Sequence, residues 1–155
     1  MIKVLFVCHG NICRSTMTES VFTYLVTQAG LASHFEINSA ATSREEIGNL
    51  PHYGTVDKLH REHIPLIPHH ARQMTAEDYR YYDYLIGMDT ANIRNMTRIT
   101  GGSDKEHKIF KLLTFAGSGR DVADPWYTGD FDATFADVMA GCSGLLEKIR
   151  REENI

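Results

Sequence analysis

Short apolar runs recur along the chain at intervals that suit strands separated by helices. The first run, residues 2–8 (IKVLFVC), is apolar apart from Lys3 and contains several β-branched residues. Such a run is typical of a strand that is buried on both faces, as in a parallel sheet. The same reading predicts three further strands, at 35–41, 82–89 and 107–113.

Amphipathic stretches lie between these runs and predict helices. The predicted helices span 15–30, 55–63, 90–99 and 131 to the end of the chain. In the first of them, Ser15 or Thr16 is expected to be the N-cap, Glu19 completes a capping box after Thr16, and Gly30 ends the helix. In the last, the apolar positions repeat with a helical period: Phe131, Phe135, Val138, Met139, Cys142, Leu145, Leu146 and Ile149.

The alternation of strands and helices predicts an α/β fold with a four-stranded parallel sheet and helices on both faces. A chain of 155 residues can bury a core of its own, so we expect a single domain over residues 1–155. Two stretches, 42–54 and 114–130, carry no predicted element. Loops of that length in a small domain are usually functional.

Composition and charge narrow the classes of function. The formal net charge is −4, so no basic field exists to attract nucleic acid, and an anionic ligand must be held by local donors. The apolar run that begins at Val4 is too short for a signal peptide or a membrane span. With three cysteines and no sign of a secretory segment, we expect a cytoplasmic protein with reduced thiols.

The stretch VCHGNICRS, residues 7–15, joins the first strand to the first helix. Ligands of open α/β sheets bind at the carboxyl ends of strands, and a helix N-terminus offers free N–H groups to an anion. Gly10 allows a tight turn, and the Arg14 guanidinium can grip two phosphate oxygens. Cys8 begins this electropositive loop, and such surroundings favour a thiolate, which is a nucleophile for phosphoryl transfer.

Three plainer interpretations compete with this one. A cysteine at the end of a strand is usually a packed apolar side chain. We expect the same of Cys142, on the apolar stripe of the last predicted helix. A zinc site needs about four ligands, and Cys8, His9 and Cys13 have no second ligand pair nearby. A purely redox pair of cysteines is compatible with the spacing but leaves Arg14 unexplained. The spacing C-x5-R between a strand and a helix favours the phosphate loop.

The segment CHGNICRS resembles the phosphate loop of the low-molecular-weight protein tyrosine phosphatases. Further segments resemble that family in the same order along the chain: SAATS (39–43), IGN (47–49), HHARQMT (69–75), YDYLIGMD (82–89) and DPWY (124–127). The resemblance covers nearly the whole chain. It implies a flavodoxin-like four-stranded parallel sheet, in agreement with the pattern of strands and helices.

The resemblance also implies catalytic roles. Cys8 would attack phosphorus and form a cysteinyl-phosphate. Arg14 and the loop amides would hold the phosphate oxygens. Asp124 would protonate the leaving oxygen and then activate water. To act at neutral pH, Asp124 must carry its proton, which neighbours such as Trp126 or Asp121 or the bound dianion would favour.

Other implied roles belong to the loop and its support. Ser15 would hydrogen-bond the Cys8 sulfur, and Asn11 would hold the shape of the loop with Ser39 and His69 behind it. Cys13 would be the redox partner that traps oxidised Cys8 in a reversible disulfide. The residues expected to bind substrate or phosphate are His9, Gly10, Asn11, Ile12, Cys13, Arg14, Ser15, Glu45, Trp126 and Tyr127. No metal or organic cofactor is implied.

Two positions bear on the substrate. Members that act on phosphotyrosine place the ring between two aromatic walls; Trp126 or Tyr127 provides one, but Glu45 stands where the other is expected. Glu45 would also repel acidic peptides. A branch of the same fold that hydrolyses phosphoarginine carries Thr at the position of Ile12. An apolar Ile12 suits an aryl phosphate better, so phosphotyrosine ranks first.

Alternatives to a tyrosine phosphatase remain open at this point. They are a phosphatase for phosphoarginine or another phosphomonoester, a thiol-coupled arsenate reductase, and a non-catalytic phosphate-binding or redox module. The reductase is disfavoured because no cysteine lies between Cys13 and Cys142. The expected partners are a phosphotyrosine protein or a small aryl phosphate, with inorganic phosphate as product and inhibitor. We expect no nucleic acid or membrane partner, and a monomer or weak self-association.

Overall fold

The computed structural model describes all residues, 1–155. Its centre is a four-stranded sheet in the order β2-β1-β3-β4, with every neighbouring pair parallel. The strands are β1 (Ile2–Cys8), β2 (Phe35–Ala41), β3 (Tyr84–Gly87) and β4 (Ile109–Lys111). The predicted α/β class and the flavodoxin-like sheet are therefore confirmed.

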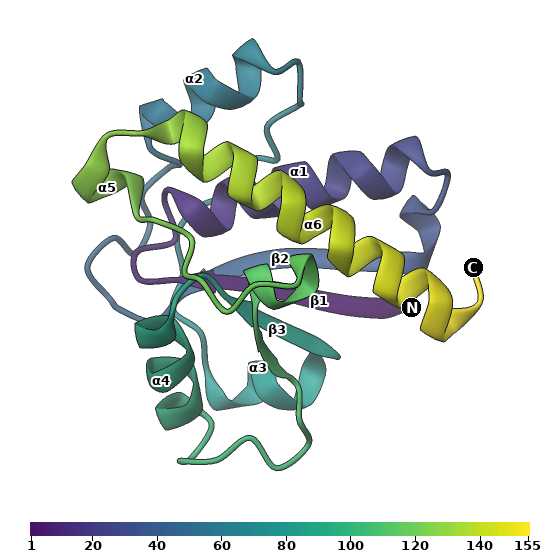
Figure 1. Cartoon of the computed structure of the whole chain (residues 1–155). Coiled ribbons are helices and arrows are strands. Elements are labelled where there is room, and N and C mark those ends of the chain that lie inside the picture. The colour runs from purple at the N-terminus through teal and green to yellow at the C-terminus, as the bar shows by residue number, and fades with distance from the viewer.

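Helices cover both faces of this sheet (Figure 1). The helices are α1 (Arg14–Gln28), α2 (Tyr53–Arg61), α3 (Ala76–Tyr81), α4 (Thr90–Ile99), α5 (Pro125–Thr128) and α6 (Phe131–Glu153), with two 3₁₀ helices, η1 (Ala32–His34) and η2 (Leu112–Ala116). Helices α1 and α6 lie on one face, and α3 and α4 lie on the other (Figure 1). None of the helices combines the length and apolar character that a membrane span requires.

The side chains of β1 point alternately to the two faces of the sheet and belong to two separate parts of the core. Val4, Phe6 and Cys8 belong to the larger apolar cluster with α1 and α6, whereas Leu5 and Val7 belong to the smaller one on the opposite face. Successive side chains of a strand point to opposite faces, so a strand buried on both sides must be apolar throughout. The position of Cys8 in this alternation directs it toward the side on which α1 begins.

Several predicted boundaries were wrong. The runs 82–89 and 107–113 are apolar beyond the residues that pair, so β3 and β4 are shorter than predicted. The predicted capping box of α1 does not form, because the N-cap is Cys13 and no side chain caps this end. The first-turn amides of α1 are thus left without a side-chain acceptor.

Two helices escaped prediction for different reasons. The N-terminus of α3 carries a capping box, in which the Asp78 carboxylate accepts from the Thr75 backbone N–H at 2.8 Å. That T-x-x-D signal was present in the sequence but was not interpreted as a helix start. Helix α5 has only four residues, too few to show a hydrophobic period.

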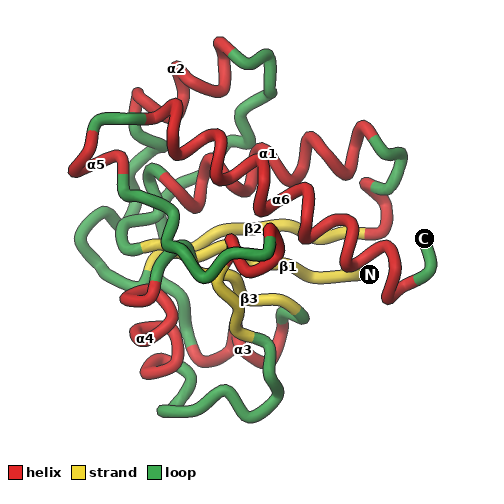
Figure 2. Tube along the Cα trace, in the orientation of Figure 1, coloured by secondary structure: helices red, strands yellow, loops and turns green.

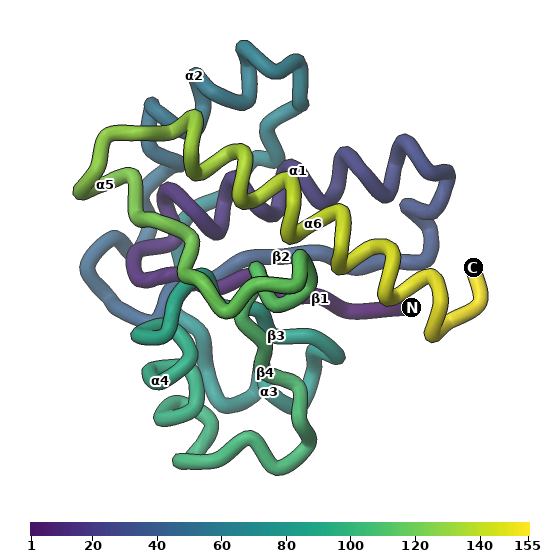
Figure 3. The backbone as a smooth tube through the Cα atoms, viewed as in Figure 1, coloured from purple at the N-terminus to yellow at the C-terminus, as the bar shows by residue number.

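Loops from separate parts of the chain meet at the carboxyl ends of the strands. Figure 2 shows the loops that follow β1 and β2 at this end of the sheet, and Figure 3 traces both of them toward the segment that enters α5. The loop after β2 is bonded to the end of β1, since the backbone N–H of Thr42 donates to Cys8 and that of Ser43 to His9. The strand ends thus converge on the segment that contains Cys8.

Candidate active site

The loop from Cys8 to Arg14 lies between the end of β1 and the first turn of α1. Its left-handed residue is Asn11, with φ +59°, and Gly10 has no positive φ. The left-handed conformation in this loop is therefore adopted by Asn11 and not by Gly10. A Cβ at Gly10 would lie 3.4 Å from the Glu46 Cγ, an ordinary contact, so glycine at this position mainly leaves the space above the loop open.

Two groups contact the Cys8 sulfur. The backbone N–H of Asn11 donates to the Sγ at 3.3 Å, and the Ser15 Oγ lies 3.1 Å from it. The Ser15 Oγ also accepts from the Asn11 Nδ2 at 2.8 Å, which leaves the hydroxyl proton free for the sulfur. Donors directed at sulfur stabilise the thiolate, the nucleophilic form.

Asn11 is in turn held by a buried polar network. Its Nδ2 donates to the Ser39 Oγ at 3.0 Å, and its Oδ1 lies 2.6 Å from the His69 Nε2. The Arg72 backbone N–H donates to the same Oδ1 at 3.2 Å. The Ser39 Oγ donates to the Glu19 Oε1 at 2.5 Å. The structure thus brings Ser39 and His69 to Asn11, and it adds Glu19 and Arg72.

Glu19 contributes the carboxyl group of this buried network. Burial raises its pKa to about 7, although the Ser39 hydrogen bond and the charge of Arg72 act in the opposite direction. Burial also lowers the pKa of His69, whose Nδ1 lies 3.7 Å from the Glu19 Oε1. Both shifts favour neutral side chains. The available signal for Glu19 was its spacing of four residues from Ser15, which places both on one helix face.

The Arg14 side chain is fixed by three acceptors and is only 3% exposed. Its NH1 donates to the Asp89 Oδ2 at 2.8 Å and to the Val122 carbonyl at 2.9 Å, and its NH2 lies 3.4 Å from the Asp124 Oδ2. Burial alone would lower the Arg14 pKa, but the negative charges of Cys8, Asp124 and Asp89 outweigh it and the pKa is raised. The guanidinium is therefore held ionised and oriented.

Asp89 was missed as a site residue by sequence reasoning. It follows β3 and caps α4, accepting from the Asn92 backbone N–H at 2.7 Å with its other oxygen. Its place after a strand next to β1 was the signal that could have found it, because parallel strands end at one edge of the sheet.

Asp124 enters the site from the far end of the chain. It is the N-cap of α5, and its Oδ1 accepts from the Trp126 backbone N–H at 3.1 Å. A quarter of its side chain is exposed. Asp121, which was expected to influence Asp124, is instead bonded to Lys111 and Thr90.

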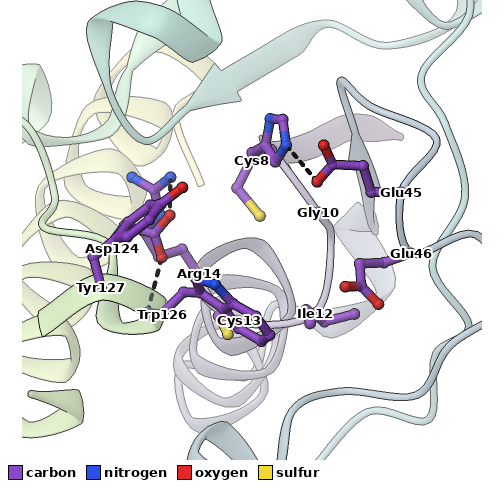
Figure 4. Close-up of a pocket in the computed structure, with 11 residues that line it drawn as sticks. Cys8, Gly10, Ile12, Cys13, Arg14, Glu45, Glu46, Asp124, Trp126 and Tyr127 are labelled. Carbon is purple, nitrogen blue, oxygen red and sulfur yellow. Dashed lines mark hydrogen bonds and ion pairs between the residues drawn. The ribbon is translucent and has the colours of Figure 1, made fainter. Parts of the chain in front are cut away.

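These side chains surround a cavity of about 110 Å³. Figure 4 shows Cys8 between a wall formed by Asp124, Trp126 and Tyr127 and an opposite wall that carries Glu45 and Glu46. The lining residues are Cys8, His9, Gly10, Ile12, Cys13, Arg14, Glu45, Glu46, Asp124, Trp126 and Tyr127. Of the predicted binding residues, Asn11 and Ser15 alone do not line the cavity, because both are buried behind the loop. Glu46 was not predicted.

Cys13 lies at the base of the cavity and is 5% exposed. Burial, followed by the charge of Cys8, raises its pKa to about 12. Cys13 is therefore held as the protonated thiol at neutral pH. Its role as a redox partner stays a prediction.

The chain matches known proteins over its whole length. The sequence model of the family described as "Low molecular weight phosphotyrosine protein phosphatase" matches residues 3–155. The chain is 40% identical to the low molecular weight protein-tyrosine-phosphatase YfkJ of Bacillus subtilis, with both chains fully covered. It is 38% identical to the human low molecular weight phosphotyrosine protein phosphatase over 94% of each chain.

Solved structures give the same result. The crystal structure of YfkJ superposes with a TM-score of 0.94 over 98% of this chain and 96% of that one. The Drosophila arginine phosphatase DARP superposes with a TM-score of 0.86 at 25% identity, over 96% of this chain and 98% of that one. The fold thus accommodates proteins whose names refer to two different phosphorylated side chains.

Proposed function

Because the chain belongs to the low molecular weight phosphotyrosine protein phosphatase family, we propose that it hydrolyses phosphotyrosine in proteins through a cysteinyl-phosphate intermediate. The family membership makes the chain a cysteine-dependent phosphatase and implies phosphoprotein substrates. The observation that carries the proposal is one cavity lined by a cysteine, an arginine and an aspartic acid at the N-terminus of α1.

In the first step, the phosphate dianion is held by the loop amides and by the Arg14 guanidinium. The Cys8 thiolate attacks phosphorus, so that the S–P bond forms while the bond from phosphorus to the tyrosine oxygen breaks. Asp124 gives its proton to that oxygen, and tyrosine leaves as a neutral phenol. Positioning and charge stabilisation supply most of the acceleration of such a transfer.

In the second step, the Asp124 carboxylate takes a proton from a water molecule, and the water oxygen attacks phosphorus. The S–P bond breaks, inorganic phosphate forms, and the Cys8 thiolate is regenerated with Ser15 donating to it. Since the same loop holds substrate and product, inorganic phosphate is expected to inhibit. No metal ion or organic cofactor takes part in either step.

Phosphotyrosine is preferred to phosphoarginine for two reasons. Ile12 lines the cavity with an apolar side chain, which suits an aromatic ring. Trp126 lines it from α5 and is 58% exposed, so its ring is free to contact a substrate ring. The same features favour small aryl phosphates as substrates in vitro.

The test is phosphate release from a phosphotyrosine peptide and a phosphoarginine peptide of identical flanking sequence, measured side by side. The Cys8→Ser protein is the blank, and we expect it to lose turnover. Faster release from phosphotyrosine supports the proposal. Faster release from phosphoarginine contradicts the substrate assignment, and substantial turnover by Cys8→Ser contradicts the covalent mechanism.

Further features are proposed with this function. A cysteine nucleophile must stay reduced, which suits a cytoplasmic location. In that setting Cys13 would protect oxidised Cys8 by forming a reversible disulfide. We also propose that residues 1–155 act as one catalytic domain and as a monomer or weakly self-associating protein.

A further inference from the structure

The two sides of the mouth of the active-site cavity differ in their chemistry. On one side the wall is aromatic, with Trp126 and Tyr127 largely exposed. On the other side Glu45 and Glu46 line the cavity, as Figure 4 shows. A site that must admit a phosphate dianion therefore carries acidic groups on one side of its entrance.

Glu45 is held in this position by the residue that follows the nucleophile. Its Oε2 lies 2.9 Å from the His9 Nε2. Nearby, the Ser43 Oγ donates to the His9 carbonyl at 2.9 Å, which attaches the loop of Glu45 to the loop of Cys8. The Glu45 carboxylate is thus oriented beside the cavity while 68% of its side chain remains exposed.

The two carboxylates at the mouth lack a permanently charged partner. The neighbour of Glu45 is an imidazole, which is charged only when protonated, and the carboxylate of Glu46 accepts from the Asn49 amide. Acidic side chains elsewhere near α2 are different, because Asp132 pairs with Lys58 at 2.8 Å and Asp57 with Arg61 at 3.0 Å. The acidic side of the mouth is therefore available to a cation.

We propose that Glu45 is a specificity-determining residue, which favours substrates with a lysine or arginine beside the phosphotyrosine and disfavours those with acidic flanks. This inference rests on the proposed function. With the phosphate bound at Arg14 and the ring against Trp126, the other side of the ring faces the wall that carries Glu45, so a substrate residue that leaves the cavity on this side comes within reach of the Glu45 carboxylate. A basic side chain there meets a preoriented carboxylate, and an acidic one meets a like charge.

The expected effect is moderate because the pair is exposed to water. Exposed ion pairs contribute little individually, but attraction of one peptide and repulsion of the other act in the same direction on their ratio. We expect kcat/KM for a lysine-flanked peptide to exceed that for a glutamate-flanked peptide by about tenfold at low ionic strength. The ratio should shrink as salt screens the charges.

The experiment measures kcat/KM for two phosphotyrosine peptides that differ only in lysine or glutamate flanks. The variants are Glu45→Gln, which keeps the shape and an acceptor for His9, and Glu153→Gln, which removes one charge at the far end of α6. We expect Glu45→Gln to reduce the preference severalfold and Glu153→Gln to keep it. Loss of preference in Glu45→Gln alone distinguishes recognition by Glu45 from an effect of net charge.

The outcomes that would overturn the role of Glu45 can be distinguished from those that would overturn the proposed function. Equal rates for both peptides in the unchanged protein, or an undiminished preference in Glu45→Gln, overturn the role of Glu45 and leave the proposed function intact. Hydrolysis of nitrophenyl phosphate without release from either peptide overturns the proposed substrate, and the role of Glu45 with it.

Discussion

Asp124 is held by two donors that belong to different parts of the site. The Trp126 amide fixes one carboxylate oxygen, and the Arg14 guanidinium lies near the other. A phosphate on Arg14 competes for that second contact and places its own negative charge close by. The carboxyl group that acts on the substrate is therefore held by contacts that change when the substrate binds.

Asp124→Asn tests the acid role, because asparagine keeps an oxygen for the Trp126 amide but cannot donate a catalytic proton. Because Asp124 also acts as the base in the second step, which both substrates share, the acid role is read from kcat/KM, which reports the first step. We expect kcat/KM for phenyl phosphate to fall by about 10²–10⁴-fold. Nitrophenyl phosphate should lose far less, since nitrophenolate leaves without protonation. Steady-state kinetics with both substrates measures the difference.

Asp130→Asn is the matched control for this variant. Asp130 caps α6 in the same way, accepting from the Ala133 backbone N–H at 2.9 Å. Both substrates should be turned over by Asp130→Asn at the unchanged rate. Equal losses of kcat/KM on both substrates in Asp124→Asn would count against an acid role in the first step.

Glu19 gives the stability a predictable pH dependence. Its pKa is about 7 in the folded protein and 4.5 in the reference state. Between these values the unfolded chain releases the proton while the folded protein keeps it, so the free energy of unfolding falls as pH rises from 4.5 to about 7. The contribution lost amounts to about 3 kcal/mol and is constant above that range.

Urea denaturation at several pH values checks this dependence. Glu19→Gln keeps an acceptor for Ser39 but does not ionise, so its stability relative to the unchanged protein should rise across the same range. Glu153→Gln, at an exposed position, should follow the unchanged protein. Parallel pH curves for Glu19→Gln and the unchanged protein would show that Glu19 is ionised in the fold.

For single residues, the sequence predicts which side chains carry the chemistry better than it predicts which side chains contact them. Cys8, Arg14 and Asp124 could be named because their residue types and spacing carry the chemistry. Glu19, Arg72 and Asp89 were not named, because their contacts join segments that meet only after folding. Glu19 was even assigned to a local capping box, whereas its observed partner is Ser39 on β2.

Among the elements, α6 shows how closely the helical layer packs on the sheet. It runs against η2, and Gly144 faces the backbone of Phe115 so closely that a Cβ at this position would overlap the carbonyl oxygen. The approach of helix and backbone therefore requires the absence of a side chain. Gly144 lies inside a helix, where glycine would otherwise be unfavourable.

Gly144→Ala should destabilise the protein by about 1–3 kcal/mol, because α6 or η2 must shift to admit the methyl group. Gly119→Ala is the matched control, since a Cβ there meets nothing within 4 Å. That control should be neutral or slightly stabilising. Thermal denaturation of both variants measures the difference, and equal stabilities would refute the close approach.

Element boundaries followed from the sequence only where one local signal dominated. The strands β1 and β2 match the predicted 2–8 and 35–41, because a polar loop follows each of them directly. The apolar runs at β3 and β4 continue into residues that are buried but do not pair with a neighbouring strand. The apolar pattern therefore overestimated the length of both strands. The start of α1 was misassigned because a loop that binds an anion needs free amides and not a side-chain cap.

In the whole molecule, β1 is the strand at which the order of the strands in the sheet reverses. It has β2 on one side and β3 on the other, and ligands of such sheets bind at this switch point. The loop of Cys8 follows β1, the loop of Glu45 follows β2, and Asp89 follows β3. Alternating strands and helices predicted the fold class, but the strand order followed only from the resemblance, since periodicity does not encode which strands are neighbours.

The two walls of the cavity differ in how they are attached to the chemistry. Asp124 and Trp126 share one turn at α5, so changing the aromatic wall also disturbs the acid. Glu45 belongs to a separate loop, anchored through Ser43 and His9. An inhibitor that seeks selectivity among phosphatases of this fold should therefore reach toward Glu45 with a cationic arm. A mutation of Glu45 that weakens such an inhibitor would reduce catalysis little, whereas a mutation in the turn of Asp124 and Trp126 would reduce it strongly.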